Sequence, residues 1–199
     1  MAYYTETRNC FPMEYLVELR KRIHQIPYLA PNNLTYDFVG ARGFSVVFKR
    51  SGIARVKERF EWLGPYLDTL LDADCNAFYL NPLLLVASSR VDPHIDRSLR
   101  AYSRTVDPPR YVSVLYVTLP ETMQGGQLVL SQGKREVGRI TPEVNKVVRF
   151  QGDLMHHVTP LGSETRGERL SVVCEQYDLP SEILAAIPEL GLESRGKRI

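Results

Sequence analysis

The sequence has few cysteines, and they do not form the patterns that bind zinc or build disulfide frameworks. Its 199 residues include only three cysteines, Cys10, Cys75 and Cys174, which lie far apart without any C-x-x-C pair. An odd and scattered set argues against a disulfide scaffold and against a zinc ribbon, and it favours a reducing compartment. We therefore expect a cytoplasmic protein.

Long apolar runs and an excess of one charge are also missing. The longest apolar run, near Pro82–Ala87, is far too short to cross a bilayer, and Met1–Glu6 lacks the layout of a signal peptide. Lysine and arginine number 25 against 23 acidic residues, so the formal net charge is only +2. This balance gives no electrostatic footprint for nucleic acid. We expect no membrane or nucleic-acid partner, while a basic substrate stays open.

Histidine is scarce as well, yet three of the 4 histidines fall in two short motifs. Asp92–Asp96 reads D-P-H-I-D, and on a strand the side chains of His94 and Asp96 would point to the same face. Two adjacent histidines follow much later, in Leu154–Leu161. Two histidines and one carboxylate on one face, with other coordination positions open, form the triad that suits non-haem Fe(II). The alternative is a satisfied histidine beside a solvated acid at a strand end.

The first part of the chain has helical periodicity. Apolar residues at three- and four-residue spacing predict helices over Pro12–Ile26 and Ala54–Leu71, with Gly64-Pro65 expected to kink or split the second. Ala41–Arg50, which lies between the two helices, alternates like a strand.

From Asn76 onward the chain reads as short strands and turns. Besides the two histidine motifs, the expected strands are Phe78–Ala87, Tyr111–Thr118, Gln127–Ser131, Glu136–Ile140, Lys146–Phe150 and Leu170–Tyr177, and Ser98–Pro109 reads as a loop. Helices followed by roughly eight strands predict an α+β chain whose β half is a closed sandwich or jelly roll. We expect one domain over residues 1–199, with support up to about residue 74, a core over about 76–179 and a C-terminal tail over 180–199.

Six motifs in this part of the chain resemble, in content and in order, those of the 2-oxoglutarate- and Fe(II)-dependent oxygenases, particularly the prolyl-4-hydroxylase-like branch. They are His94-Ile95-Asp96, Tyr116-Val117-Thr118, Gly125-Gly126-Gln127-Leu128, Pro142–Phe150, His156–Leu161 and Gly167–Ser171. The resemblance extends from about Phe78 to Tyr177. It implies a double-stranded β-helix core, which is a cupin-like jelly roll, with N-terminal helices that buttress it.

The resemblance also implies which residues bind the metal and the cosubstrate. His94, Asp96 and His156 match the Fe(II) ligands, and His157 falls on a variable position. Arg169 matches the residue that holds the far carboxylate of 2-oxoglutarate, for which a guanidinium offers two parallel hydrogen bonds. Ser171 and Tyr116 are the expected hydroxyl donors to that carboxylate, while Leu128 is an expected apolar wall.

The sequence departs from the family pattern at three places. The link from His156 to Arg169 is longer than is common, and Arg166 would restore the shorter spacing but lacks the G-x-R-x-S surroundings. The strand before H-x-D lacks the frequent tyrosine, since Tyr79 lies further upstream, and Glu175 stands where many relatives have tryptophan. A different interpretation of Arg169 is a surface pair with an acid such as Glu168.

The function that the resemblance implies is hydroxylation of a second substrate, coupled to the release of succinate and CO₂ from 2-oxoglutarate. The implied cofactors are Fe(II), 2-oxoglutarate and O₂, with ascorbate as a candidate reductant. The substrate would be a peptidyl proline or a related residue. Alternatives are a free small molecule, an inactive β-helix that only binds a ligand, and a cupin-type metalloprotein, which the absent H-x-H motif disfavours. We expect the N-terminal part and the loop Arg97–Pro109 to choose the substrate.

Overall fold

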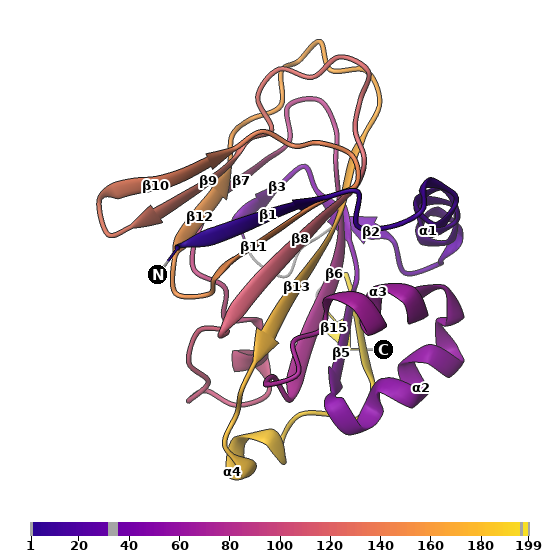
Figure 1. The fold of residues 1–199 in the computed structure, drawn as a ribbon, viewed down its shortest axis with the longest axis vertical. Coiled ribbons are helices and arrows are strands. Elements are labelled where there is room, and N and C mark those ends of the chain that lie inside the picture. The colour runs from indigo at the N-terminus through magenta and orange to yellow at the C-terminus, as the bar shows by residue number, and fades with distance from the viewer. Residues whose placement is uncertain (1, 32–35, 196, 199) are drawn as a thin grey trace.

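Two antiparallel β-sheets pack face to face in this protein (Figure 1). The structure is a computed structural model that describes residues 2–31, 36–195 and 197–198. The main path of the 10-stranded sheet is β1-β11-β8-β13-β6-β5-β14-β15, with β4 beside β6 and β2 beside β4. The 5-stranded sheet has the order β10-β9-β12-β7-β3. This architecture confirms the α+β class and the jelly-roll core expected from the sequence.

The strands of both sheets have the following bounds. The larger sheet contains β1 (Tyr4–Arg8), β2 (Ala30–Pro31), β4 (Arg42–Gly43), β5 (Ser45–Lys49), β6 (Ala77–Leu85), β8 (Tyr111–Thr118), β11 (Lys146–Gln151), β13 (Arg169–Tyr177), β14 (Gly191–Ser194) and β15 (Lys197–Arg198). The smaller sheet contains β3 (Phe38–Val39), β7 (Arg90–His94), β9 (Leu128–Gln132), β10 (Arg135–Ile140) and β12 (Met155–Val158). All the strands expected from Phe78 onward are therefore present, with ends that differ by a few residues.

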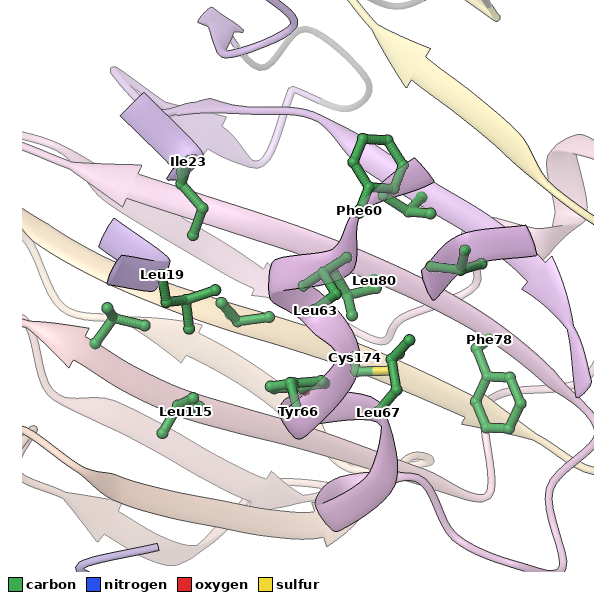
Figure 2. Packing of buried hydrophobic residues seen from close by; sticks show 14 of the residues in the cluster. Leu19, Ile23, Phe60, Leu63, Tyr66, Leu67, Phe78, Leu80, Leu115 and Cys174 are labelled. Atoms are coloured by element: carbon green, nitrogen blue, oxygen red, sulfur yellow. The ribbon is translucent and has the colours of Figure 1, made fainter. Parts of the chain in front are cut away.

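Three helices cover the outer face of the larger sheet, and their apolar sides form one buried cluster with it (Figure 2). They are α1 (Met13–Gln25), α2 (Ile53–Arg59) and α3 (Gly64–Leu70). Leu19 and Leu63 of the helical layer lie against Leu80 and Leu115 of the sheet, and all four side chains are fully buried. These helices lie in the part of the chain where the sequence predicts a helical support for the core. In the described ranges, no helix combines the length and apolar character needed to cross a membrane.

The second helical stretch breaks earlier than the sequence indicates. The 3-10 turns η1 (Arg50–Gly52) and η2 (Glu61–Leu63) flank α2, and α3 then begins at Gly64 with Pro65 in its first turn. Proline lacks a backbone N–H and is well tolerated at that position, so it starts a helix here rather than kinking one. The split itself is set by packing, because Phe60 and Leu63 both turn into the core.

The C-terminal segment, which the sequence predicted as a tail over 180–199, contributes strands to the larger sheet. After α4 (Ser181–Leu184), strand β14 pairs with β5 in the larger sheet, and β15 pairs with β14. Leu192 belongs to the helical-layer cluster, and Ser194 donates a hydrogen bond to the carbonyl oxygen of Tyr28 at 2.7 Å. Burial and ladder hydrogen bonds therefore make this segment part of the fold.

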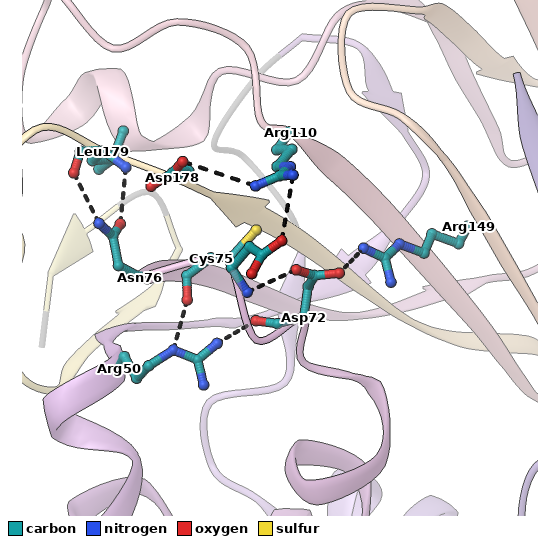
Figure 3. A network of polar contacts seen from close by, with 9 residues as sticks. Arg50, Asp72, Cys75, Asn76, Arg110, Arg149, Asp178 and Leu179 are labelled. Atoms are coloured by element: carbon teal, nitrogen blue, oxygen red, sulfur yellow. Dashed lines mark hydrogen bonds and ion pairs between the residues drawn. The ribbon is translucent and has the colours of Figure 1, made fainter. Parts of the chain in front are cut away.

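A polar network fastens the turn between α3 and β6 to the sheet (Figure 3). The guanidinium of Arg50 donates to the carbonyl oxygens of Cys75 and Asp72, and Arg149 pairs with the Asp72 carboxylate. Asn76 exchanges two hydrogen bonds with the backbone of Leu179, at 2.8 and 2.9 Å. The helical layer and the end of β13 are consequently held at fixed positions.

Two turns explain why the family motifs contain glycine and asparagine. Gly125 has φ +73°, and a Cβ there would lie 1.9 Å from the carbonyl oxygen of Pro160. Asn145 also has a positive φ of 64°, and its amide group accepts from and donates to the backbone of Phe11. Only residues that tolerate the left-handed region fit such turns. The turns bring β9 next to β12 and fix the N-terminal segment.

Candidate active site

Three candidate metal ligands converge at the edge where β7 and β12 run side by side. His156 on β12 lies directly opposite His94 on β7 in the antiparallel ladder, and Asp96 follows two residues after His94. The Nε2 atoms of His94 and His156 lie 3.2 and 3.4 Å from the two carboxylate oxygens of Asp96. One ligand atom from each residue lies within 4.8 Å of the others, so the three side chains can hold a metal ion.

Backbone carbonyls orient both imidazole rings. Nδ1 of His94 lies 2.8 Å from the carbonyl oxygen of Asp92, and Nδ1 of His156 lies 3.1 Å from that of Leu154. A carbonyl only accepts, so each Nδ1 carries a hydrogen, and each Nε2 can bind a cation once it carries no proton. Such outer hydrogen bonds are typical of histidines that bind metals. The donor set, two neutral imidazoles and a carboxylate, therefore fits Fe(II) with open coordination positions.

Neighbouring groups within the site shift the pKa values of Asp96 and His94. Burial raises the pKa of Asp96, but the charge of His156 and hydrogen bonds from both histidines outweigh it and hold this pKa well below its usual range. Burial likewise lowers the pKa of His94, but the hydrogen bond to Asp96 outweighs it and raises this pKa to about 9. Asp96 is thus an anion at neutral pH, and a cation that binds here displaces a proton from His94.

A cavity between the two sheets joins these ligands to the side chains predicted to bind 2-oxoglutarate. Arg169 and Ser171 of β13 line it together with the three ligands. The rest of the wall is apolar and consists of Phe38, Leu83, Val91, Val112, Val114, Leu128, Phe150, Val158 and Val173. Leu128 thus lies where an apolar wall was predicted. The cavity therefore has a polar end at β13 and apolar side walls.

Several polar atoms at this end of the cavity are buried without a hydrogen-bond partner. Among the residues that the structure describes, they include Nε and Nη1 of Arg169, the hydroxyl of Tyr116 and the hydroxyl of Ser171. The exposed fraction of Arg169 is only 1%. A buried guanidinium without a counter-ion is strongly unfavourable, so the site is built to receive an anion.

Tyr116 lies on β8, where the strand ladder sets it opposite Ser171. The guanidinium carbon of Arg169 lies 5.1 Å from the centre of its ring. Burial raises the pKa of Tyr116, which keeps the phenol protonated and able to donate a hydrogen bond. Two hydroxyl donors and a guanidinium therefore meet in one place, which is the donor set that a carboxylate needs.

The alternatives for the histidine pair and for Arg169 are decided by side-chain direction. His157 lies on the opposite face of β12 from His156, where it is only partly buried. Arg166 is exposed in the loop before β13. Glu168 accepts hydrogen bonds from Arg20 and His24 of α1, at 2.9 and 2.7 Å, and forms no pair with Arg169 in the described part of the chain. The interpretation of Arg169 as a surface pair with this acid is wrong.

Three residues around the site were not predicted from the sequence. The ring of Phe38 lies 5.4 Å from the His94 ring, and Phe150 packs edge-on against His156 at 5.0 Å. Phe150 closes the motif Pro142–Phe150, so that motif could have indicated its place, whereas nothing local marks Phe38. Glu175, noted only as a departure from the family pattern, is buried on the inner face of β13.

Comparison with solved structures gives neighbours of the same fold. A prolyl-4-hydroxylase from Pseudomonas putida is 17% identical, with 90% of this chain and 95% of that chain covered and a TM-score of 0.60. A Trichoplax adhaerens prolyl hydroxylase, solved with a peptide fragment of the hypoxia inducible factor oxygen degradation domain, has 15% identity, coverage of 93% and 87%, and a TM-score of 0.60. HygX from Streptomyces hygroscopicus, solved with nickel and 2-oxoglutarate, is 13% identical, with 87% of this chain and 82% of that chain covered and a TM-score of 0.53. No curated protein matches the sequence.

A family model is more specific than these distant likenesses. The model described as the 2OG-Fe(II) oxygenase superfamily matches residues 83–174. This stretch contains all three candidate ligands and Arg169. The match confirms the resemblance inferred from the motifs, and with it an oxidoreductase class that uses Fe(II), 2-oxoglutarate and O₂. Residues 83–174 of this chain thus match the 2OG-Fe(II) oxygenase superfamily.

Proposed function

We propose that the protein is a hydroxylase in which His94, Asp96 and His156 hold Fe(II), and Arg169, Tyr116 and Ser171 hold 2-oxoglutarate. The observation that carries this proposal is the buried, unpaired guanidinium of Arg169, which lines the same cavity as the three ligands. The far carboxylate of 2-oxoglutarate would supply the missing counter-ion. Its 2-oxo acid end would then extend along the cavity toward the metal ligands.

The side chains have separate tasks in this reaction. Fe(II) with bound 2-oxoglutarate supplies the activation of O₂, with release of succinate and CO₂. Asp96 and the two histidines fix the cation at one edge of the cavity, and the backbone carbonyls that hold each Nδ1 keep their rings from turning. Tyr116 and Ser171 donate to the far carboxylate while Arg169 neutralises it. The valines, Leu128 and Phe150 exclude water from the reacting groups.

We assign the second substrate to a second pocket, of about 300 Å³, that also reaches the metal ligands. His94 and Asp96 belong to its wall as well as to the cosubstrate cavity, so a molecule bound there would reach the metal. Phe38 and Tyr79 line it, and Arg97, Ser98 and Ala101 form part of its wall on the loop that begins after Asp96. The predicted role of Arg97–Pro109 in substrate choice rests on this position.

A peptidyl proline or a related residue is the substrate that we favour. The likeness to two prolyl hydroxylases, one of them solved with a peptide fragment, supports this choice. A free small molecule is the second candidate, because HygX has also been solved with hygromycin B in addition to nickel and 2-oxoglutarate. Turnover of proline-containing peptides against free amino acids and aminoglycosides, followed by succinate release, distinguishes the two.

Anaerobic titration with Fe(II) and 2-oxoglutarate tests the site itself. The wild-type protein should develop the weak visible charge-transfer band of the Fe(II)–2-oxoglutarate complex. His156→Ala should abolish the band, whereas the matched control His157→Ala should keep it. Arg169→Ala should need far more 2-oxoglutarate to produce it. If the wild-type protein forms no band and holds no iron, the proposal is wrong, and an inactive β-helix that only binds a ligand becomes the better interpretation.

We also propose that the protein acts in the cytoplasm. All three cysteines are free, and Cys75 and Cys174 are buried. Burial raises the pKa of the Cys75 thiol to about 11, so this group is unreactive. Free thiols are typical of reducing compartments. Fractionation of the native host with an antibody against the protein tests this assignment.

A further inference from the structure

A second buried acid lies close to the metal ligands. Glu175 is 3% exposed and occupies the same face of β13 as Arg169 and Ser171, since alternate residues of a strand point the same way. Its carboxyl group accepts from the main-chain N–H of Ser98 at 3.2 Å and from the hydroxyls of Ser98 and Tyr177. None of these donors is charged.

Ser98, which donates hydrogen bonds to Glu175, lies two residues after Asp96, in a segment of the metal site that no strand holds. Strand β7 ends at His94, and the 3-10 turn η3 (Ser98–Ala101) begins at Ser98. Ile95, Asp96 and Arg97 belong to no strand or helix. Both histidines are therefore held by the ladder between β7 and β12, whereas Asp96 is carried by a short link between a strand end and a turn.

We propose that Glu175 is a positioning residue that fixes Asp96 for metal binding. By holding both the backbone and the hydroxyl of Ser98, its carboxyl group anchors the far end of the link to the central strand of the larger sheet. The near end is anchored at His94. A link fixed at both ends holds the Asp96 carboxylate against the two imidazoles. This inference rests on the proposed metal site and adds a residue to it.

The cost of burying Glu175 supports a role for its hydrogen bonds. Burial, and then the negative charge of Asp96, raise its pKa to about 8. An apolar side chain would fill the same space without this penalty. Glutamine, in contrast, keeps the shape and can satisfy the same three partners, because the hydroxyl of Ser98 can accept as well as donate.

Metal affinity of the purified full chain, measured with Co(II) by calorimetry and by the shape of its visible d–d spectrum, tests the proposal. Glu175→Ala should weaken Co(II) binding by about tenfold or more, the loss typical of removing an outer partner of a metal ligand. Glu175→Gln should restore both affinity and spectrum. Glu193→Ala is the matched control, since Glu193 is also a buried acid that accepts from two tyrosines, but it forms no hydrogen bond with Ser98 in the described part of the chain.

The outcomes separate this inference from the proposed function. A wild-type protein that binds no Co(II) or Fe(II) would contradict the metal site and the inference with it. If the wild type binds and Glu175→Ala, with native circular dichroism, has the same affinity and spectrum, only the inference is wrong. Equal losses in Glu175→Ala and Glu193→Ala would also overturn it. If Glu175→Ala does not fold, Ser98→Ala decides, with a weaker affinity expected and an unchanged one contradicting the proposal.

Discussion

The two faces of strand β13 are both buried, but one is apolar and the other is polar. On the outer face, Leu170, Val172 and Cys174 are completely buried against the helical layer. On the inner face, Arg169 and Ser171 are equally buried but have polar atoms without partners in the described part of the chain. One strand therefore carries both an apolar surface that stabilises the fold and a polar surface that the fold alone leaves unsatisfied.

The two faces contribute to the free energy of unfolding with opposite sign. Apolar burial of the outer face contributes roughly 25 cal/mol for each Å² removed from water. The unpaired guanidinium of the inner face opposes folding, and its cost is recovered only when an anion binds. Residues that destabilise the protein without bound cosubstrate are thus the ones we expect to bind 2-oxoglutarate most strongly.

The largest effect should come from Arg169→Met. Loss of one partner of a buried charge pair costs about 2–5 kcal/mol, so the Kd for 2-oxoglutarate should rise at least about thirtyfold. The melting temperature of the cosubstrate-free protein should stay the same or rise, because the unpaired buried charge is gone. Calorimetric titration and thermal unfolding measure the two quantities. A large drop in Tm with unchanged affinity would reverse the assignment of the two faces.

Leu63→Ala should do the opposite. Its side chain, at the end of η2, is fully buried in the cluster between the helical layer and the larger sheet, and Leu→Ala changes in such places cost about 2–5 kcal/mol of unfolding free energy. Affinity for 2-oxoglutarate should not change at a temperature where the variant is folded. Urea unfolding measures the loss, and Val17→Ala on the exposed side of α1 serves as a control with a change within about 0.5 kcal/mol.

Glu175→Gln should change how stability depends on pH. The pKa of Glu175 is raised from 4.5 to about 8, first by burial and then by the charge of Asp96. Its contribution to the unfolding free energy is therefore full below pH 4.5 and is lost as the pH rises toward 8. The variant lacks this loss, so its stability relative to wild type should increase over that interval. Urea unfolding of the metal-free proteins measures the difference, and a constant difference would contradict the prediction.

Ser171→Ala should have the smallest effect. A single hydroxyl donor contributes about 1 kcal/mol, so the Kd for 2-oxoglutarate should rise roughly fivefold. The hydroxyl lacks a partner in the described part of the chain, so removing it should leave the stability of the empty protein unchanged. Thermal unfolding and calorimetric titration again measure both quantities. A loss of affinity as large as that of Arg169→Met would mean that Ser171, and not Arg169, dominates anion binding.

The sequence predicted the parts of the molecule whose pattern is local. The strand alternation and the six motifs were enough to predict the β core and to select His94, Asp96 and His156 as candidate ligands, but Asp96 lies beyond the end of β7 and not on the strand expected for it. The short strand β1 was missed since four of its five residues are exposed and give no apolar alternation. Glu175 could not be assigned a role, because Ser98 lies 77 positions away in the sequence.

Because His94 is paired directly with His156, the metal site forms only when β7 and β12 pair in the correct register. A slip of β12 by one residue would turn His156 outward and present His157 to the site, while the buried Val158 would be exposed to water. In a barrel with this register error, His157 would occupy the position of the ligand His156. A cation that requires His94, His156 and Asp96 together stabilises only the correct alignment. Metal ions present during refolding would then raise the yield of correctly paired chains.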